Sequence, residues 1–146
     1  MTNLRISTNK NELNIPLIHH FLSTQTAWAK NIPLPTLKKA IVNSLCFGGF
    51  IDNQQIAFAR VITDGATFAN LVDVFVIPDC RDKGHGKSLM EAVFTHPQLQ
   101  GLRRFTLATS DAHGLYEKFG FKPPLYPNTY MEIYNPNIYK ALNQIN

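Results

Sequence analysis

The feature that most constrains the fold is a glycine-containing loop, Arg81–Gly86, which lies between a strand-like run and a helical run. Thr67–Ile77 is rich in β-branched and aromatic residues and stops at Pro78, which predicts a long strand. A helical stretch begins at Lys87, and Arg103–Ala108 is again strand-like. A strand, a helix and a second strand in this order predict a crossover connection within one sheet.

The segment before this loop predicts an antiparallel meander. Leu45–Ile51 and Gln55–Thr63 are strand-like, and Asp52-Asn53-Gln54 between them has the composition of a tight hairpin turn. Asp64-Gly65 makes the next turn, which leads into the long strand. Strands joined by such short connections are expected to pair with their neighbours in sequence.

The other elements are mostly helical. Apolar spacing predicts a helix from Asn11, as the N-cap, to about Lys30, and two prolines then precede a second helix at Thr36–Val42. The remaining predicted elements are a first strand at residues 4–7, a helix from Asp111 (as N-cap) to Phe119 ended by Gly120, a strand at Thr129–Tyr134 and a last helix at Asn137–Leu142. Helices on such a sheet predict a mixed α/β (α+β) fold in one domain, residues 1–146.

The composition narrows the class of protein. The chain has 146 residues, 45% of them apolar and 16% charged, which suits one globular domain. No apolar run approaches the ~20 residues of a membrane helix, and no basic patch followed by an apolar run begins the chain. Cys46 and Cys80 form no metal-ligand spacing, nor do the histidines. We therefore expect a cytoplasmic protein without a metal site.

The formal net charge of +4 admits an anionic partner but does not identify one. Lys and Arg residues are scattered, with pairs only at Lys38-Lys39 and Arg103-Arg104, and no basic helix or aromatic-plus-basic stripe is present. No sequence motif therefore supports nucleic-acid binding. A mildly basic surface suits an anionic small ligand equally well.

A glycine-rich loop between a strand and a helix is typical of phosphate binding, because backbone N–H groups converge there at the positive end of the helix dipole. Gly86-Lys87-Ser88 is similar to the end of a P-loop, but the first glycine of that motif would fall at Arg81. Gly84-His85-Gly86 is similar to the start of a dinucleotide fingerprint, but its third glycine would fall at Leu89. Both nucleotide motifs lack a residue that their mechanism needs.

The pattern Arg81-x-x-Gly84-x-Gly86 resembles instead the pyrophosphate loop of the GNAT acyltransferase superfamily, which has Gln or Arg, two residues, Gly, one residue, then Gly or Ala. A second segment, Asp111–Phe121, resembles the one in which these enzymes place a helix before Tyr-x-x-x-Gly-Phe. Its distance from the glycine loop also matches the family. The resemblance covers about residues 45–125, and the two motifs together are more specific than either alone.

This resemblance implies a mixed, mostly antiparallel central sheet flanked by about four helices. The sheet opens as a V-shaped splay between the strand before the glycine loop and the next, parallel strand, and the pantetheine of acetyl-coenzyme A lies there. Lys87 and Ser88 either contact the pyrophosphate or simply occupy the first turn of the helix. By resemblance, the coenzyme-binding residues are the main chain of Phe75, Val76 and Ile77 for the pantetheine, and Arg81, Asp82, Lys83, Gly84, His85, Gly86, Lys87 and Ser88 for the pyrophosphate.

The resemblance also implies two catalytic residues. Tyr116 stands at the position of the tyrosine that protonates, or hydrogen-bonds to, the departing thiolate of coenzyme A. Asp73 stands where the family often keeps an acidic residue, and it is the expected general base, acting directly or through a water. Asp64, Asp111 and His113 remain further candidates for the general base. The competing role of Asp64 is to cap a turn, and that of Asp111 is to act as the N-cap of a helix.

The implied function is transfer of an acetyl group from acetyl-coenzyme A to a primary amine by direct attack in a ternary complex. Trp28 either shapes a wall of the acceptor site or packs in the core. The alternative function is that of an acyl-coenzyme A-binding sensor or scaffold without efficient catalysis. The expected partners are a small-molecule or peptide amine and, as is common in the family, a second copy in a homodimer, but neither nucleic acid nor a membrane. The fold does not choose the amine.

Overall fold

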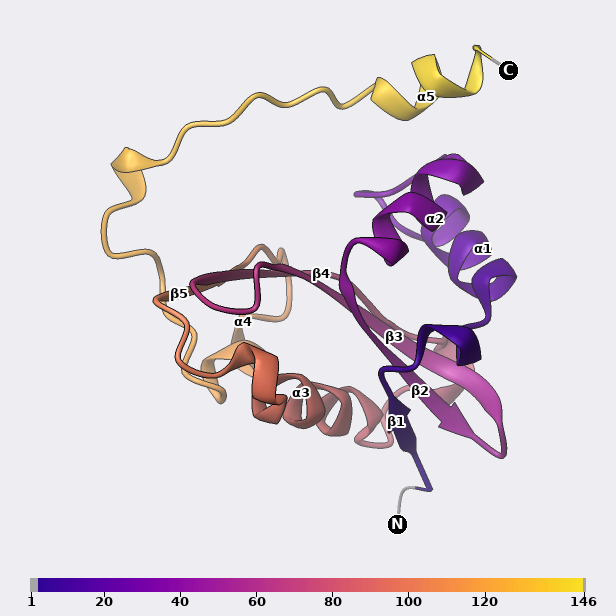
Figure 1. Ribbon diagram of the computed structural model, residues 1–146, viewed down its shortest axis with the longest axis horizontal. Coiled ribbons are helices and arrows are strands. Elements are labelled where there is room, and N and C mark those ends of the chain that lie inside the picture. Colours follow the sequence, from indigo (N-terminus) through magenta and orange to yellow (C-terminus); the bar gives the residue numbers. More distant parts are fainter. Residues whose placement is uncertain (1–2, 146) are drawn as a thin grey trace.

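The computed structural model describes residues 3–145 and is organised around a five-stranded sheet (Figure 1). The first four strands pair antiparallel, and the fifth joins the fourth in parallel. The predicted meander and the predicted crossover are both confirmed. In spatial order, which is also sequence order, the strands are β1 (Arg5–Ser7), β2 (Leu45–Ile51), β3 (Gln54–Thr63), β4 (Phe68–Val76) and β5 (Arg104–Leu107).

Two left-handed residues close the hairpin between β2 and β3. Asp52 has a φ of 50° and Asn53 a φ of 64°, and Asn and Asp tolerate this region better than other non-glycine residues. A two-residue turn with positive φ at both positions matches the twist of the strands that it joins. The predicted tight turn therefore fixes the register of the β2–β3 pair.

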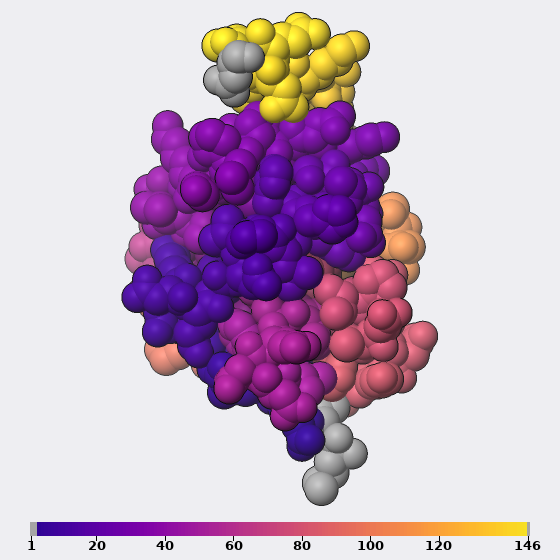
Figure 2. Space-filling model, turned by 90° about the vertical axis from the view of Figure 1, so that its right-hand side faces the viewer, coloured from indigo at the N-terminus to yellow at the C-terminus, as the bar shows by residue number. Residues whose placement is uncertain are grey.

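Helices cover both faces of the sheet. α1 and α2 lie over one face and α3 over the other, as Figure 1 shows. Figure 2 shows these layers from the side, with α5 (yellow) above the α1–α2 layer. Among residues 3–145, no helix is long and apolar enough to cross a membrane. The helices are α1 (Ile15–Gln25), α2 (Leu34–Val42), α3 (His85–Thr95), α4 (His113–Glu117) and α5 (Ile138–Asn143), with short 3-10 turns at Lys10–Glu12, Pro78–Cys80, Pro97–Leu99 and Pro127–Thr129.

Buried side chains form one cluster on each face of the sheet. On the α3 side, Phe47 of β2 packs with Leu89 of α3 and their neighbours. On the α1–α2 side, Phe58 of β3 packs with Leu22 of α1. Each fully buried side chain of this size contributes roughly 1.5–3 kcal/mol. The two clusters hold the central strands, including β4, in fixed positions.

The start of α1 differs from the prediction. Asn14, not Asn11, is the N-cap, and its side-chain oxygen accepts a hydrogen bond from the Leu17 N–H at 3.0 Å. Pro16 lies in the first turn, where the missing N–H would have no helical partner in any case. The proline therefore favours a helix that begins beside it rather than at Asn11.

The predicted strand at Thr129–Tyr134 is wrong. Thr129 ends a 3-10 turn, and residues 130–135 pair with no strand in the part of the chain that the structure describes. Every residue from 122 to 138 is exposed, and the segment arches away from the body before α5 returns to it (Figure 1). A strand is stable only as part of a ladder, and this segment pairs with no strand of residues 3–145.

Candidate functional site

The parallel pair separates partway along its length. β4 and β5 are in register from Phe68–Arg104 to Leu71–Leu107, but β4 continues to Val76 without β5 beside it. The two strands therefore diverge toward their carboxyl ends, which confirms the predicted splay. In parallel sheets such a divergence is where ligands bind. Beyond Leu71, no strand of residues 3–145 pairs with β4 on the β5 side, although the Val76 carbonyl there accepts from Arg81 Nε. The other backbone groups on this side are left for an extended ligand.

The three residues expected to bind pantetheine do not face the same way. The Ile77 N–H donates to the Ile56 carbonyl at 2.9 Å, so it is directed toward β3. The backbone N–H and C=O groups of successive residues in a strand point to alternate sides. The backbone groups of Val76 are therefore directed toward the splay, and those of Phe75 toward β3. The Phe75 ring stacks on Phe21 at 4.1 Å in the core. Val76 is therefore the expected main-chain partner among the three.

The glycine loop ends in an open helix N-terminus. Asp82 (φ 62°) and Gly84 (φ 81°) take left-handed conformations that turn the chain into α3. Helix α3 begins at His85, and its first helical bond runs from the Ser88 N–H to the Gly84 carbonyl at 3.1 Å. The N–H groups of the residues between them have no helical acceptor, and no side chain caps this end. Such a terminus favours an anion.

The two glycines of the loop have open space where a side chain would lie. A Cβ added at Gly84 or Gly86 would meet no atom within 4 Å. Lys83 and Lys87 are exposed beside the loop, and each supplies a positive charge within reach of a bound phosphate. The open glycines, the unused N–H groups and the two lysines fit a pyrophosphate. On these grounds the loop suits the coenzyme that the sequence predicted.

Two of the other loop side chains hydrogen-bond to backbone carbonyls. Arg81 Nε donates to the Val76 carbonyl at 2.9 Å, which ties the loop to the end of β4. Ser88 Oγ donates to the Gly84 carbonyl at 3.2 Å, and Asp82 is exposed. His85 is buried, and its Nδ1 has no hydrogen-bond partner among the described residues. The loop therefore presents mainly backbone, with side chains that brace it.

Tyr116 lies on α4, which follows β5 and so leaves the sheet at the same edge as the glycine loop. Its side chain is 8% exposed and packs edge-on against Phe121, with the ring centroids 6.1 Å apart. Burial, with the negative charge of Asp111 as the smaller cause, raises the pKa of Tyr116 above its ordinary value. The phenol therefore keeps its proton at neutral pH and is available as a donor.

The start of α4 corrects the expected N-cap. The N-cap position is Ala112, not Asp111, and no side chain caps the helix directly. Thr109 Oγ1 instead accepts from the N–H groups of Ala112, at 3.0 Å, and Asp111, at 3.4 Å. Asp111 and His113 are both exposed. They stand near Tyr116 in the chain without being held in one orientation by a described partner.

Asp73 lies at an irregularity in β4 and is buried. Its φ is 54°, and the register between β3 and β4 shifts beside it, between Phe58 and Arg60. Arg60 Nε donates to one carboxylate oxygen at 2.8 Å and Trp28 Nε1 to the other at 3.0 Å. Each oxygen retains a second acceptor position. The carboxylate is therefore held in place by Trp28 and by Arg60 of β3.

Trp28 and Arg60 complete this network. Trp28 is 61% exposed, so the alternative that it packs in the core is wrong. Arg60 was not singled out from the sequence, although a charged residue within the otherwise apolar run Ile56–Val61 was a usable signal. Its guanidinium also donates to Ser44 Oγ at 3.0 Å. Asp73 is thus held by β3 and by the loop that follows α1.

Asp64 caps a turn, which was the structural alternative to a role as general base. Its carboxylate accepts from the N–H groups of Ala66 (2.9 Å), Thr67 (2.8 Å) and Phe68 (3.3 Å) and from the Thr67 hydroxyl (2.6 Å). These hydrogen bonds, the one from the Thr67 hydroxyl first, hold the pKa of Asp64 well below its ordinary value. The residue therefore caps the β3–β4 turn.

The two cysteines differ in their surroundings. Burial raises the pKa of the Cys46 thiol to about 11, so Cys46 is not suited to act as a nucleophile. Cys80 is half-buried beside the glycine loop. In residues 3–145 no group of three His, Cys, Asp or Glu side chains could hold a metal ion.

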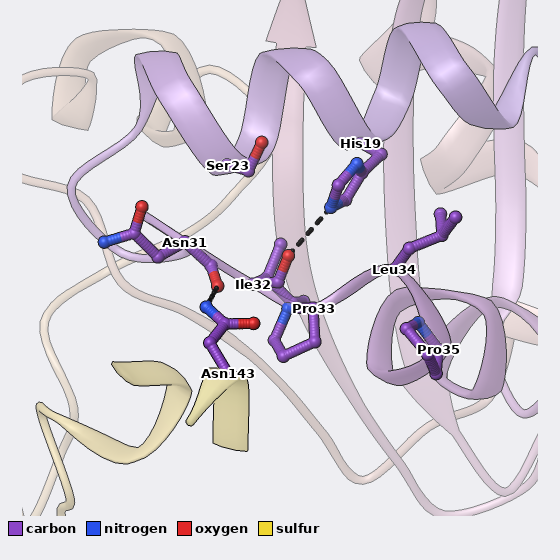
Figure 3. Close-up of a pocket in the computed structure, with 8 residues that line it drawn as sticks. All are labelled: His19, Ser23, Asn31, Ile32, Pro33, Leu34, Pro35 and Asn143. Carbon is purple, nitrogen blue, oxygen red and sulfur yellow. Dashed lines mark hydrogen bonds between the residues drawn. The ribbon is translucent and has the colours of Figure 1, made fainter. Parts of the chain in front are cut away.

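A separate pocket of about 310 Å³ lies between α1, residues 31–35 at the start of α2, and α5 (Figure 3). His19 Nε2 in this pocket is 2.8 Å from the Ile32 carbonyl oxygen, and the side chain of Asn143 closes it from α5. None of the predicted site residues lines it. The pocket therefore stands apart from the glycine loop and from Tyr116.

Known proteins match this arrangement. A family model described as an acetyltransferase (GNAT) domain matches residues 43–123, which contain Asp73, the glycine loop and Tyr116. A relative from Gibberella zeae, provisionally named an acetyltransferase, is 30% identical over 135 residues, which cover 77% of this chain and 75% of its own. A crystal structure from Xanthomonas campestris pv. campestris, described as belonging to the GNAT family, is 59% identical, with a TM-score of 0.93 over 95% of this chain and 98% of that one. A Clostridium acetobutylicum structure with acetyl-coenzyme A shares the fold at 16% identity, with a TM-score of 0.65 over 92% of this chain and 96% of that one.

Proposed function

Because the chain belongs to the GNAT acetyltransferase family, we propose that it moves an acetyl group from acetyl-coenzyme A to a primary amine by direct attack in a ternary complex. The observation that carries this proposal is the splay between β4 and β5, with an uncapped helix N-terminus and Tyr116 at the same edge. That edge offers an anion cradle and a proton donor together. Two cysteines without a disulfide agree with the expected cytoplasmic location.

Different residues around the splay bind different parts of the coenzyme. The N–H groups at the start of α3 and the charges of Lys83 and Lys87 hold the pyrophosphate. The Val76 N–H pairs with the pantetheine arm and directs the thioester along β4. These contacts use the backbone at rigid positions, so they orient the thioester without moving the loop.

The acetyl transfer then needs three proton movements. Asp73, directly or through a water, takes a proton from the substrate ammonium, and the free amine nitrogen attacks the thioester carbonyl carbon. The new C–N bond forms as the C–S bond breaks, and the departing thiolate takes the proton of the Tyr116 hydroxyl. The nitrogen, now positively charged, gives its second proton to solvent and becomes the neutral amide. Solvent returns a proton to the tyrosine and takes the one that Asp73 holds. The products are the acetylated amine and free coenzyme A.

Release of free thiol tests this function. Purified protein incubated with acetyl-coenzyme A should release thiol faster when a cognate amine is present, and the amine should gain one acetyl group by mass spectrometry. Small amines, amino acids, peptides with free N-termini and lysine-containing peptides form the screen. An acyl-coenzyme A sensor would instead bind acetyl-coenzyme A tightly and release no thiol above the background with any of them.

Substitution of Gly86 by leucine separates binding from folding. Gly86 lies in the first turn of α3, and a Cβ there meets nothing, so the fold should keep its stability or gain up to about 1 kcal/mol of helix propensity. A leucine side chain nevertheless occupies the space of the pyrophosphate. We expect coenzyme A affinity, measured by calorimetry, to fall at least about tenfold, equivalent to ~1.4 kcal/mol.

The control for this variant is Glu91→Leu, which places the same side chain at an exposed position of the same helix. It should bind coenzyme A like the native protein. Unchanged affinity in Gly86→Leu, with both variants folded by circular dichroism, would show that the loop does not hold the pyrophosphate.

A further inference from the structure

Trp28 is an exposed aromatic side chain that is held in one place. It is the only tryptophan of the chain, and it is 61% exposed. Its indole Nε1 nevertheless donates to the carboxylate of the buried Asp73 at 3.0 Å. One edge of the ring is thus tied to a buried group, while most of the ring surface faces solvent. An exposed ring that is fixed in this way is a preorganised contact surface.

The loop that carries Trp28 is fixed as well. This loop joins α1 to α2, and its residues Ala29 and Ile32 are buried. Thr26 Oγ1 accepts from the Ala29 N–H at 3.1 Å, and His19 Nε2 of α1 is 2.8 Å from the Ile32 carbonyl oxygen, a contact that Figure 3 shows. The backbone is therefore held close to Trp28, so binding a ligand to the ring requires little further ordering of the loop.

The ring lies beside the proposed general base. Asp73 is two positions beyond Leu71, where the pairing of β4 with β5 ends. A general base that acts directly comes within about 3 Å of the group that it deprotonates. Trp28 Nε1 is 3.0 Å from one Asp73 oxygen, so an ammonium in contact with that oxygen lies within about 6 Å of the indole nitrogen. The part of the acceptor next to its amine is therefore a neighbour of the ring.

The charge of the layer around Trp28 discriminates among amines. From Leu13 to Ile51, which includes α1, α2 and the loop between them, the sequence has no Asp or Glu. The lysines of the same stretch are all exposed. The Asp73 carboxylate is already paired with the Arg60 guanidinium at 2.8 Å. A second positive charge on the acceptor would therefore meet repulsion in this layer and no carboxylate of its own.

Exposed apolar side chains lie on the same face of the sheet. Arg60 and Ile62 are two residues apart in β3, so their side chains share a face, and this face is opposite to the α3-side core. Ile62 is 44% exposed, and Phe68, on the same face of β4, is 42% exposed. Such a surface favours an acceptor with an apolar body over one that is polar throughout.

We propose that Trp28 selects the acceptor, and that the acceptor is an arylalkyl amine: a flat aromatic body, which stacks on the Trp28 ring, and a single positive charge. Two aromatic rings in contact gain attraction beyond the burial of their surfaces. This inference rests on the proposed acetyl transfer, in which Asp73 receives the ammonium proton. Trp28 itself takes no proton. It determines which amine is placed at Asp73.

The fluorescence of the single tryptophan measures this contact directly. Native protein with excess coenzyme A is titrated with phenethylamine, with its saturated analogue cyclohexylethylamine, and with para-xylylenediamine, which carries a second charge. Phenethylamine should change the emission of Trp28 saturably, with a Kd roughly 2- to 12-fold lower than that of the saturated analogue, the range for one aromatic pair. The diamine should bind more weakly than phenethylamine. An analogue or a diamine that binds as tightly as phenethylamine, or an emission that no amine changes, would overturn the proposal.

A ratio of two kcat/KM values separates the ring from the base. Trp28→Leu removes the ring and also one donor to Asp73, but the change at Asp73 affects both monoamines equally. The kcat/KM ratio of phenethylamine to cyclohexylethylamine should therefore fall from the native value to about one in Trp28→Leu, whereas Trp28→Phe, which keeps a ring, should retain part of the preference. The control Tyr126→Leu removes an aromatic side chain of similar exposure, 65%, and should keep the native ratio. A native ratio in Trp28→Leu would show that the ring does not select the acceptor.

The failure of this inference can be told apart from the failure of acetyl transfer. Thiol release with both monoamines at equal kcat/KM would leave acetyl transfer standing and refute the role of Trp28. Saturable binding of phenethylamine beside Trp28, with no thiol release from acetyl-coenzyme A in the presence of any amine, would refute acetyl transfer and leave the ring as the contact of an aromatic amine.

Discussion

Replacement of Tyr116 by phenylalanine is expected to lower turnover about 100-fold, within the range usual for loss of a general acid. The side chain is buried and packs on Phe121, and phenylalanine keeps those contacts. The pKa of the tyrosine is raised by burial, so the native phenol remains protonated below its ordinary pKa of ~10 and supplies a proton throughout the neutral range. Steady-state kinetics with an amine from the thiol-release screen would measure the loss.

The affinity of the same variant for coenzyme A should stay nearly unchanged, because the expected contacts of the coenzyme lie on β4 and the glycine loop. Tyr139→Phe, on α5, removes a hydroxyl of the same kind far along the chain and should leave turnover as it is. Equal turnover in Tyr116→Phe and native protein would remove Tyr116 from the mechanism. An affinity loss as large as the turnover loss would make it a binding residue instead.

Replacement of Asp73 by asparagine is expected to reduce the free energy of unfolding by about 3 kcal/mol. The substitution leaves the Arg60 guanidinium, whose side chain is 15% exposed, without its negative partner at 2.8 Å. Urea denaturation would show the midpoint move to lower concentration with little change in slope. Asp52→Asn, an exposed site in the β2–β3 turn, serves as the control, since asparagine accepts the same left-handed backbone.

A second substitution then separates stability from catalysis. The variant with Asp73→Asn and Arg60→Gln buries no unpaired charge, so most of the lost stability should return. If Asp73 is the general base, this double variant stays slow at neutral pH and gains rate as rising pH deprotonates the amine without help. Recovery of the native rate at pH 7 in the refolded double variant would assign Asp73 to structure alone.

The sheet could be predicted from the sequence because its signals are local. The strand within Thr67–Ile77 follows from its β-branched and aromatic residues, and the turn at Asp52-Asn53 follows from those two residues. Both depend only on residues that are neighbours in the chain. The glycine loop was equally visible. The start of α3 was predicted two residues late, since His85 and Gly86 have low helix propensity, and the left-handed Gly84 begins the helix without a side-chain cap.

The Asp73 network was missed because its residues are distant in the chain. Asp73 accepts hydrogen bonds from Trp28 and Arg60 only after α1 and the sheet have packed. No short-range sequence pattern predicts these contacts. The N-cap of α4 was assigned to Asp111 because aspartate is a common N-cap, whereas Thr109 supplies the oxygen two residues earlier. The predicted strand at Thr129–Tyr134 does not form among the described residues, because a strand needs a pairing edge and the local sequence says nothing about where such an edge lies.

The parallel pairing of β4 with β5 has a consequence for how the protein is made. The meander β2–β3–β4 joins strands that are neighbours in sequence, so it can form as soon as residue 76 has left the ribosome. The wall opposite β4 arrives only with residues 104–107, and Tyr116 later still. During synthesis, the nascent chain therefore has a sheet before it has a coenzyme cleft. Binding competence is among the last properties that the chain acquires.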